Sequence, residues 1–360
     1  MKKICVVTLY GNYNFGNKLQ LYAVQSICRN IGFDVEALRF FDSNNYNYAN
    51  NKVKKNILKW REVFKTIVLK KEYRNKKFRE FEKNYLIMSR RYVFEDKQHR
   101  GIEKKYDRFI VGSDQVWNPY FGLKGDLKFL TFVNKKRKVS LAASIGTEEI
   151  PEKMKNDYIT GLKSLDYISV REDKAKKLVE ELTDRKDVEV ILDPTMLIQK
   201  EEWKKISKKP ENLKDENYIL NYFLGNLSDE RKEKIKKLAS DNGWKIIDVM
   251  NPNDKFYNIG PSEFIYLEEH AKLICTDSFH SCVFGILMNT PFVVFDREDV
   301  STKSMNSRIQ TLLEKFELLN RKYKGELNNE ILQMSFSNIN SVLEKERIKA
   351  KKFLEIALKG

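Results

Sequence analysis

Apolar and polar residues alternate along most of this chain in a pattern that predicts buried strands separated by amphipathic helices. Runs rich in Val, Ile, Leu and Phe occur at residues 3–9, 34–41, 107–111, 139–145, 165–170, 188–192, 218–224, 244–249, 272–276 and 291–295. Between them apolar positions recur at helical spacing, as at Leu19, Tyr22, Ala23, Ile27 and Ile31. Strands that alternate with helices predict an α/β fold, with parallel sheets flanked by helices.

The chain is too long, at 360 residues, for one small core and suggests two domains. Residues 199–216 are polar and Lys-rich, and we interpret them as a linker between domains. We therefore expect one Rossmann-like domain over residues 1–198 and a second over residues 199–337. The basic amphipathic helix predicted at residues 338–360 would cross back onto the first domain.

Residues 44–105 interrupt the alternation of strand and helix. An Asn-rich stretch at 44–51 predicts a mobile loop, and the basic stretch at 52–85 has helical spacing. We therefore predict a helical insert in the first domain. It could dock an acceptor, a partner or a membrane surface, but a solvated basic face is the simpler interpretation.

The formal net charge of +16 bears on the choice of partners. A charge of this size can attract nucleic acid, anionic substrates or membrane head groups. The lysines are scattered, however, and no helix-turn-helix or RNA-binding signature occurs. We favour a solvated basic surface and expect no nucleic-acid partner.

The four cysteines inform the expected location. They lie in apolar segments without CxxC spacing, which predicts reduced core residues: Cys5, Cys28, Cys275 and Cys282. No run of 18 apolar residues occurs, and the N-terminus reads as a strand rather than a signal peptide. We expect a cytoplasmic protein, with peripheral contact at the inner face of the plasma membrane left open. We find no metal-ligand cluster.

The most informative stretch is a polar elbow at residues 276–280, between a predicted strand and a predicted helix. In an open parallel sheet, ligands bind outside the carboxyl ends of the strands. A helix start also offers free N–H groups to an anion. His280 can move a proton near neutral pH, so we expect it to be catalytic. Asp277 would either orient His280 or cap the helix, and Ser278 suits the N-cap.

Three other predicted strand ends carry polar residues. The first strand leads into a glycine-containing loop that lacks the GxGxxG dinucleotide fingerprint, with Asn14, Gly16 and Asn17 as binding candidates. A plain tight βα turn is the alternative there. Arg171 follows the strand at 165–170, where it would either clamp a phosphate or carboxylate or form an ion pair.

A polar loop follows the strand at 107–111. Its small residues let a ligand approach, its polar side chains can bond hydroxyl groups, and its tryptophan offers a flat face to a sugar. The candidates are Gly112, Ser113, Asp114, Gln115, Trp117 and Asn118. A structural turn capped by aspartate is the alternative.

Several of these segments together resemble the polysaccharide pyruvyl transferase family. The resemblance covers roughly residues 3–320 and is carried, in order, by NYNFGNKLQLYA, DRFIVGSDQVWN, ISVRED, ILDPTML, GPSEF, TDSFHSCVFGILMNTPFVVF and NSRIQTLL. It implies two Rossmann-like domains in a glycosyltransferase-B-like arrangement. Members with an assigned activity transfer pyruvate from phosphoenolpyruvate onto a sugar as a ketal. The resemblance therefore implies phosphoenolpyruvate as co-substrate, a glycan or lipid-linked oligosaccharide as acceptor, and no cofactor.

The resemblance also suggests roles for individual residues. His280 matches the family's histidine, which would be the general acid, and Arg171 matches an arginine used for the donor. Well-studied members carry Arg-x-His at the elbow, whereas Ser278 stands here two positions before the histidine. The missing cation would come from Arg308, in the helix predicted at 304–319, or from a lysine elsewhere.

Two other functions fit the same sequence. A transferase of this fold could use a nucleotide-sugar as donor. A non-enzymatic binding protein would use the charge alone.

Overall fold

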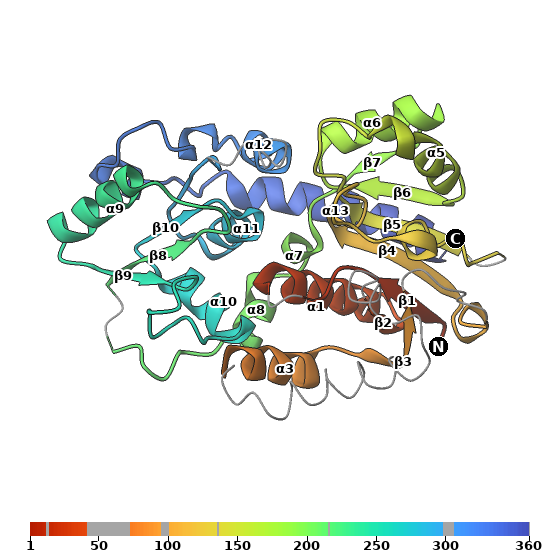
Figure 1. Ribbon diagram of the computed structural model, residues 1–360, viewed down its shortest axis with the longest axis horizontal. Coiled ribbons are helices and arrows are strands. Elements are labelled where there is room, and N and C mark those ends of the chain that lie inside the picture. The colour runs from red at the N-terminus through yellow and green to blue at the C-terminus, as the bar shows by residue number, and fades with distance from the viewer. Residues whose placement is uncertain are drawn as a thin grey trace.

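The computed structural model describes residues 1–11, 14–41, 73–94, 101–134, 137–214, 217–297 and 306–359. Two parallel β-sheets, each flanked by helices, form this part of the chain (Figure 1). The first sheet lies within the first 190 residues, and the second lies between residues 218 and 294. The division into domains at residue 198 stays a prediction.

The first sheet has seven strands in the order β3-β2-β1-β4-β5-β6-β7. They are β1 (Lys3–Val7), β2 (Asp34–Phe41), β3 (Met88–Phe94), β4 (Arg108–Asp114), β5 (Arg137–Ala143), β6 (Tyr167–Val170) and β7 (Glu189–Val190). All neighbouring pairs are parallel. The accompanying helices are α1 (Phe15–Asn30), α3 (Tyr73–Tyr85), α4 (Gly125–Lys128), α5 (Lys155–Lys163), α6 (Asp173–Thr183), α7 (Pro194–Leu197) and α8 (Lys200–Ile206).

The second sheet has four parallel strands in the order β11-β10-β8-β9. They are β8 (Tyr218–Tyr222), β9 (Lys245–Asp248), β10 (Leu273–Thr276) and β11 (Phe292–Val294). Helices α9 (Asp229–Asp241), α10 (Pro261–His270), α11 (Phe279–Met288) and α12 (Asn306–Lys315) accompany it. β8, β10 and β11 are fully buried and rich in β-branched and aromatic residues, as burial on both faces requires, whereas β9 at the edge is only partly buried.

The insert at 44–105 differs from the prediction. Residues 42–72, which hold the Asn-rich stretch and much of the basic one, lie outside the described residues. The segment after them forms α3, as expected, but Met88–Phe94 forms β3 and pairs with β2 at the sheet edge. The prediction of a helical insert over residues 44–105 is therefore wrong at its end, where it missed this strand. Ser89 and Val93 are buried while Arg90 and Tyr92 are exposed, which is the alternation of an edge strand.

The final helix, α13 (Ile339–Lys359), lies against the first sheet. Arg108 and Arg137, at the starts of β4 and β5, donate to the carbonyl groups of Leu358 and Ala357. Arg347 donates to the carbonyl groups of Met196 and Ile198, beside α7. The end of the chain therefore packs on the half of the protein that contains its beginning.

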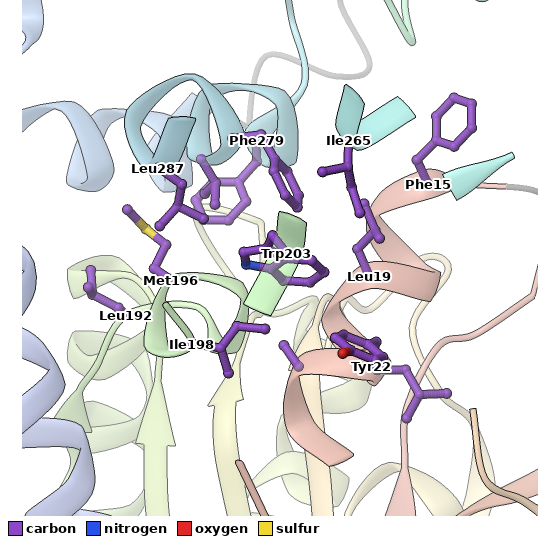
Figure 2. Close-up of a cluster of buried hydrophobic side chains, with 14 of the residues drawn as sticks. Phe15, Leu19, Tyr22, Leu192, Met196, Ile198, Trp203, Ile265, Phe279 and Leu287 are labelled. Atoms are coloured by element: carbon purple, nitrogen blue, oxygen red, sulfur yellow. The ribbon is translucent and has the colours of Figure 1, made fainter. Parts of the chain in front are cut away.

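One hydrophobic core runs through both halves (Figure 2). The ring of Phe15 at the start of α1 stacks on Phe264 of α10, with centroids 4.3 Å apart. Trp203 of α8 is fully buried between Tyr22 and Phe284. The predicted linker at 199–216 thus contributes a core residue, and aromatic packing fixes one half against the other.

The structure also informs the predictions on cysteines and membrane spans. All four cysteines are buried and unpaired, as core packing requires. Within the described ranges, no helix combines the length and apolar character needed to cross a bilayer.

Candidate active site

The site is built where the strand order of each sheet reverses. In the first sheet β1 lies between β2 and β4, and in the second β8 lies between β9 and β10. The connections after the two neighbouring strands lead in opposite directions at these points, so the loops separate and leave room for a ligand. The loop after β4 and the elbow after β10 are therefore the natural places for functional side chains, and helices α1 and α11 begin beside them.

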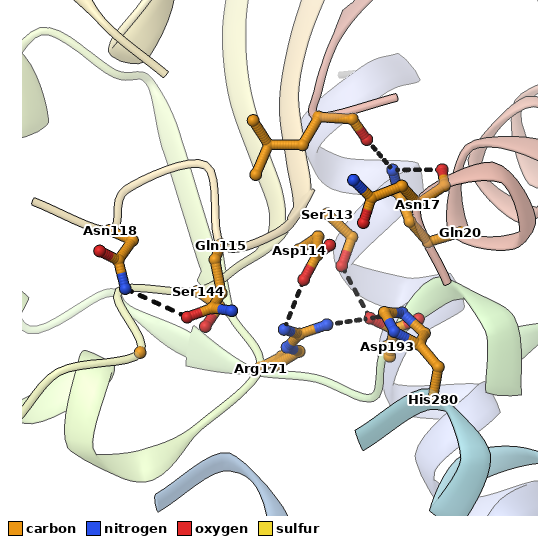
Figure 3. Close-up of polar contacts among 12 residues, drawn as sticks. Asn17, Gln20, Ser113, Asp114, Gln115, Asn118, Ser144, Arg171, Asp193 and His280 are labelled. Atoms are coloured by element: carbon orange, nitrogen blue, oxygen red, sulfur yellow. Dashed lines mark hydrogen bonds and ion pairs between the residues drawn. The ribbon is translucent and has the colours of Figure 1, made fainter. Parts of the chain in front are cut away.

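Arg171 forms the centre of a buried charge cluster (Figure 3). Its Nη1 donates to Oδ2 of Asp193 at 2.7 Å, and its Nη2 donates to Oδ1 of Asp114 at 2.9 Å. The hydroxyl group of Ser113 also lies 2.9 Å from Oδ2 of Asp193. The three charged residues come from the ends of β4, β6 and β7, so one edge of the sheet supplies the whole cluster.

The ion pairs hold both carboxyl groups in the charged state. Burial raises the pKa of Asp193, but Arg171, His280 and the bonds from Thr195 outweigh it and lower that pKa to about 2. Burial is likewise outweighed at Asp114, chiefly by Arg171, and its pKa is lowered. Of the two roles expected for Arg171, the structure shows the ion pair. Its guanidinium group is committed to two carboxylates rather than free to clamp a substrate.

His280 lies between the two halves, in the first turn of α11. It is 6% exposed, and its Nε2 lies 3.9 Å from Oδ2 of Asp193. Nε2 has no hydrogen-bond partner among the described residues. Burial and the nearby guanidinium groups of Arg171 and Arg308 lower its pKa despite the opposing carboxylates. The imidazole is therefore neutral near pH 7 and has one nitrogen available.

The glycine loop after β1 reaches the same place. A Cβ atom added to Gly16 would lie 2.2 Å from Nδ1 of His280, so the imidazole packs directly on this backbone. Asn14 is the N-cap of α1, and its side chain accepts from the Asn17 N–H. Of the three candidates in this loop, only Gly16 is seen to touch the predicted catalytic residue.

Arg308 is a buried cation without an ion pair in the described part of the chain. It lies in the first turn of α12, is 6% exposed, and its guanidinium carbon is 5.9 Å from the centroid of the Phe279 ring. The Arg171 guanidinium carbon lies 4.2 Å from the same ring. Burial, reinforced by Arg171, lowers the pKa of Arg308 to about 10, so the group stays charged at pH 7. A buried charge without a partner is costly and marks a functional site.

Two residues of the site were not predicted as functional. Asp193 belongs to an Asp-Pro-Thr turn that caps α7, and a cap alone explains an aspartate at that position. Glu172 follows Arg171, and its Oε1 accepts from Ser144, Ile145 and Gly146, while Oε2 has no hydrogen bond among the described residues and lies 3.9 Å from Nε of Arg171. Burial raises the pKa of Glu172. The only sequence feature that could have identified Asp193 and Glu172 as site residues is that each follows a predicted strand.

Asp277 fills neither of its two predicted roles. Its carboxylate accepts from the backbone N–H groups of Leu224 and Gly225, each at 2.7 Å, and pairs with Arg297 at 3.0 Å. It therefore fixes the loop after β8, and the prediction that it is catalytic is not supported by any contact with His280. Ser278 occupies the N-cap position as expected, but its side chain forms no capping bond.

The prediction that Trp117 offers a flat face to a sugar is wrong. Its indole is fully buried, packs near Phe129, and donates to the carbonyl group of Lys128. The sequence shows a tryptophan after a strand but not which way the loop turns it. Gly112 has a φ of +114° and no room for a side chain beside Leu141, so its role is conformational.

Gln115 and Asn118 shape the loop rather than face open space. The Asn118 amide donates to Oε1 of Gln115 at 3.1 Å, and its Oδ1 accepts from the N–H groups of Tyr120 and Phe121. Both residues are at most 9% exposed. The polar groups predicted to bind hydroxyls are therefore largely used within the loop itself.

The remaining arrangement has a definite chemical capacity. A buried guanidinium that has no carboxylate partner among the described residues can hold an anion, and a nearby imidazole nitrogen can transfer a proton. The start of α1 adds oriented backbone N–H groups next to that imidazole. The site is thus suited to a reaction in which an anionic substrate gains or loses a proton.

The sequence pattern of the polysaccharide pyruvyl transferase family matches residues 14–299, which contain Asp114, Arg171, Asp193 and His280 and every described strand except β1. The chain belongs to the polysaccharide pyruvyl transferase family. The resemblance read from the motifs is therefore confirmed, and membership makes the protein a transferase. No functionally curated protein matches the chain significantly.

Solved structures agree on the fold of this family member. The UDP-GlcNAc 2-epimerase of Methanocaldococcus jannaschii is similar with a TM-score of 0.52 and 15% identity, covering 99% of each chain. Staphylococcus aureus MnaA bound to UDP is similar with a TM-score of 0.50 and 12% identity, covering 98% of this chain and 91% of that one. The predicted fold class is confirmed: two Rossmann-like halves in a glycosyltransferase-B-like arrangement.

Proposed function

We propose that this transferase moves pyruvate from phosphoenolpyruvate onto a sugar of a cell-surface polysaccharide or its precursor, forming a ketal. Family membership supports the general class of reaction. The observation that carries the proposal is the presence of two groups: the buried guanidinium of Arg308, which forms no ion pair within the described residues, and the available Nε2 of His280. A donor with a phosphate, a carboxylate and a protonatable carbon would use both.

Arg308 is the proposed donor-binding residue. Phosphoenolpyruvate carries two anionic groups, and a guanidinium can hold either one through two parallel hydrogen bonds. Arg171 cannot replace it without giving up Asp114 or Asp193. Arg308 would therefore supply the positive charge that an arginine provides in other family members at the position occupied here by Ser278.

His280 is the proposed proton carrier. The methylene carbon of phosphoenolpyruvate gains one proton and becomes a methyl group, which leaves the adjacent carbon electrophilic. Two sugar hydroxyl oxygens then bond to that carbon as its bond to the phosphate ester oxygen breaks. One hydroxyl proton replaces the proton given by the imidazole, and the other leaves on phosphate. General acid catalysis of this kind contributes roughly 10²–10⁴-fold in rate.

The low pKa of His280 is compatible with this role because the donor changes its surroundings. In the free protein, burial and two guanidinium groups favour the neutral imidazole. A bound anion at Arg308 would offset one of those positive charges and favour the imidazolium. The donor would thereby promote the protonation of the acid that acts on it.

The test measures phosphate release with phosphoenolpyruvate and glycans that end in galactose or N-acetylmannosamine. We expect release to require both substrates, and phosphoenolpyruvate to stabilise the protein against heat. Stabilisation by UDP but not by phosphoenolpyruvate would instead favour a nucleotide-sugar transferase. Salt-sensitive binding of random DNA, unchanged in His280→Ala and without phosphate release, would favour a binding protein.

A further inference from the structure

We propose that Tyr120 and Phe121 form an aromatic platform on which a sugar ring of the acceptor glycan packs. This inference rests on the proposed function, since it assigns the acceptor to a place beside the same site. The two residues follow β4 in the loop that begins at Asp114. They supply the flat apolar surface that the buried Trp117 does not.

The two side chains protrude from a loop that is otherwise buried. Residues 114–119 are buried, Tyr120 and Phe121 are 71% and 50% exposed, and Gly122 and Leu123 are buried again. Exposing two neighbouring aromatic rings leaves apolar surface in water, which costs free energy that burial would recover. Exposed aromatic residues in a rigid loop beside a polar site therefore indicate a surface that a ligand covers.

The backbone holds this pair in a fixed position. Oδ1 of Asn118 accepts from the N–H groups of Tyr120 at 2.9 Å and Phe121 at 3.4 Å. The Gly122 N–H donates to the Asn118 carbonyl at 2.9 Å, and the Leu123 N–H donates to the Val116 carbonyl at 2.9 Å. A platform that is already ordered loses little entropy when it binds.

Gly122 permits the tight turn that follows the pair. A Cβ atom there would lie 2.6 Å from the Asn118 carbonyl oxygen and 2.7 Å from the Val116 carbonyl oxygen. Any side chain would push the loop open. Each residue of the local sequence Asn-Pro-Tyr-Phe-Gly therefore has a role in the loop. The asparagine caps the turn and the proline fixes its backbone conformation. The two aromatic rings are exposed, and the glycine lets the backbone pass close to the preceding carbonyl groups.

The platform lies on the same sheet edge as the charge cluster. Asp114 binds Arg171, and the following residues Gln115 and Asn118 continue along this edge beside Ser144 (Figure 3). The Trp117 N–H donates to the Ser144 carbonyl, which ties the loop to the end of β5. The loop that carries the pair is therefore continuous with the charge cluster, and we place a second sugar of the acceptor over this loop.

The chemistry of the pair suits a carbohydrate. One face of a pyranose ring presents C–H groups, and the electron-rich face of an aromatic ring attracts such positive edges. The Tyr120 hydroxyl can also donate to or accept from a sugar hydroxyl. Neither feature recognises a phosphate, so the platform would select the acceptor and leave donor binding to Arg308.

Kinetic comparison of the two substrates tests the platform. We expect Tyr120→Ala and Phe121→Ala to raise the acceptor KM about tenfold or more, the range for stacking on aromatic side chains, with the phosphoenolpyruvate KM unchanged. Tyr120→Phe keeps the ring and should keep most of the affinity. Ile348→Ala, which removes an exposed apolar side chain on α13, is the matched control.

Direct binding to galactose- and N-acetylmannosamine-terminated glycans separates this inference from the proposed function. An acceptor KM that is the same in the double variant and the wild type would overturn the platform and leave the transfer reaction intact. If the wild type releases no phosphate with either glycan, the reaction fails. Glycan binding lost in the double variant would then still support the platform, and absent or unchanged binding would overturn it.

Discussion

The imidazole of His280 packs on the backbone of Gly16, although the two residues lie in helices, α1 and α11, that accompany different sheets of the protein. A Cβ at position 16 would lie 2.2 Å from Nδ1, far inside van der Waals contact. The first turns of α1 and α11 meet at this point. The position of the proposed acid therefore depends on how closely the two halves approach.

Gly16→Ala should displace the imidazole and impair catalysis. We expect kcat to fall by roughly 10²-fold or more, because the general acid loses its position. Circular dichroism and thermal unfolding would show whether the variant is folded. Gly11→Ala is the matched control, since a Cβ there meets nothing within 4 Å and should leave kcat unchanged. Wild-type rates in Gly16→Ala would contradict the packing described here.

His280→Ala should abolish most turnover with a small effect on stability. The side chain brings a buried nitrogen without a partner, so its removal also removes an unsatisfied polar atom. We expect a loss of roughly 10²–10⁴-fold in kcat. Phosphate-release assays and urea denaturation measure the two effects. Retained turnover would remove His280 from the reaction.

Arg308 and Arg171 should respond oppositely to replacement by methionine. Arg308→Met removes a buried charge that has no ion pair in the described part of the chain, so the protein should stay folded while the KM for phosphoenolpyruvate rises at least about tenfold. Arg171→Met leaves Asp114 and Asp193 buried without their partner and should destabilise the protein by about 3–5 kcal/mol.

Denaturation and donor titration of both variants distinguish these outcomes. Arg308→Lys keeps the charge but not the bidentate geometry, and should recover only part of the donor affinity. Equal loss of stability in Arg308→Met and Arg171→Met would show that Arg308 is a structural cation.

The buried acid Glu268 should make stability depend on pH. Its carboxyl group on α10 accepts from the Ser281 hydroxyl, and burial raises its pKa well above the ordinary value of 4.5. Because the folded pKa is raised, the contribution to stability is complete below about 4.5 and is lost as pH rises toward the folded pKa.

Glu268→Gln keeps the shape of the side chain and removes this titration. Urea denaturation at several pH values above 5 should show the variant gaining stability relative to wild type as pH rises. A difference between the two proteins that does not change with pH would mean that Glu268 ionises normally.

Donor binding should raise the pKa of His280. In the free protein this pKa lies below 6.5, and the anion proposed at Arg308 would offset a charge that lowers it. An NMR titration of the imidazole, with and without phosphoenolpyruvate, measures the change. Because the folded pKa is depressed, the stability contributed by His280 is present above pH 6.5 and falls as pH drops. An unchanged or lower pKa in the complex would contradict the proposed coupling.

The sequence predicted much of the fold because each strand is a short apolar run followed by a turn. β2, for example, has the predicted bounds. β3 was missed because its sequence, with adjacent arginines, resembles the basic helix before it. A strand at a sheet edge buries one face only, so its apolar signal is weak.

The candidate site could be predicted only in part. The position of His280 follows from local sequence, since a polar elbow after a buried strand is a recognisable pattern. The partners of Arg171 do not, because Asp114 lies 57 residues away and Asp193 lies 22 residues away. The orientation of Trp117 is set by Phe129 and by the ends of neighbouring strands, which no local pattern reveals.

The aromatic packing between the halves has a consequence for turnover. Separating the halves would expose rings such as Phe15 and Phe264 to water, and full exposure of one such side chain costs roughly 1.5–3 kcal/mol. A hinge motion that separated the two halves in every catalytic cycle would require this free energy each time. Substrates would therefore reach the imidazole, and phosphate would depart, through rearrangement of surface loops while the interior stays closed.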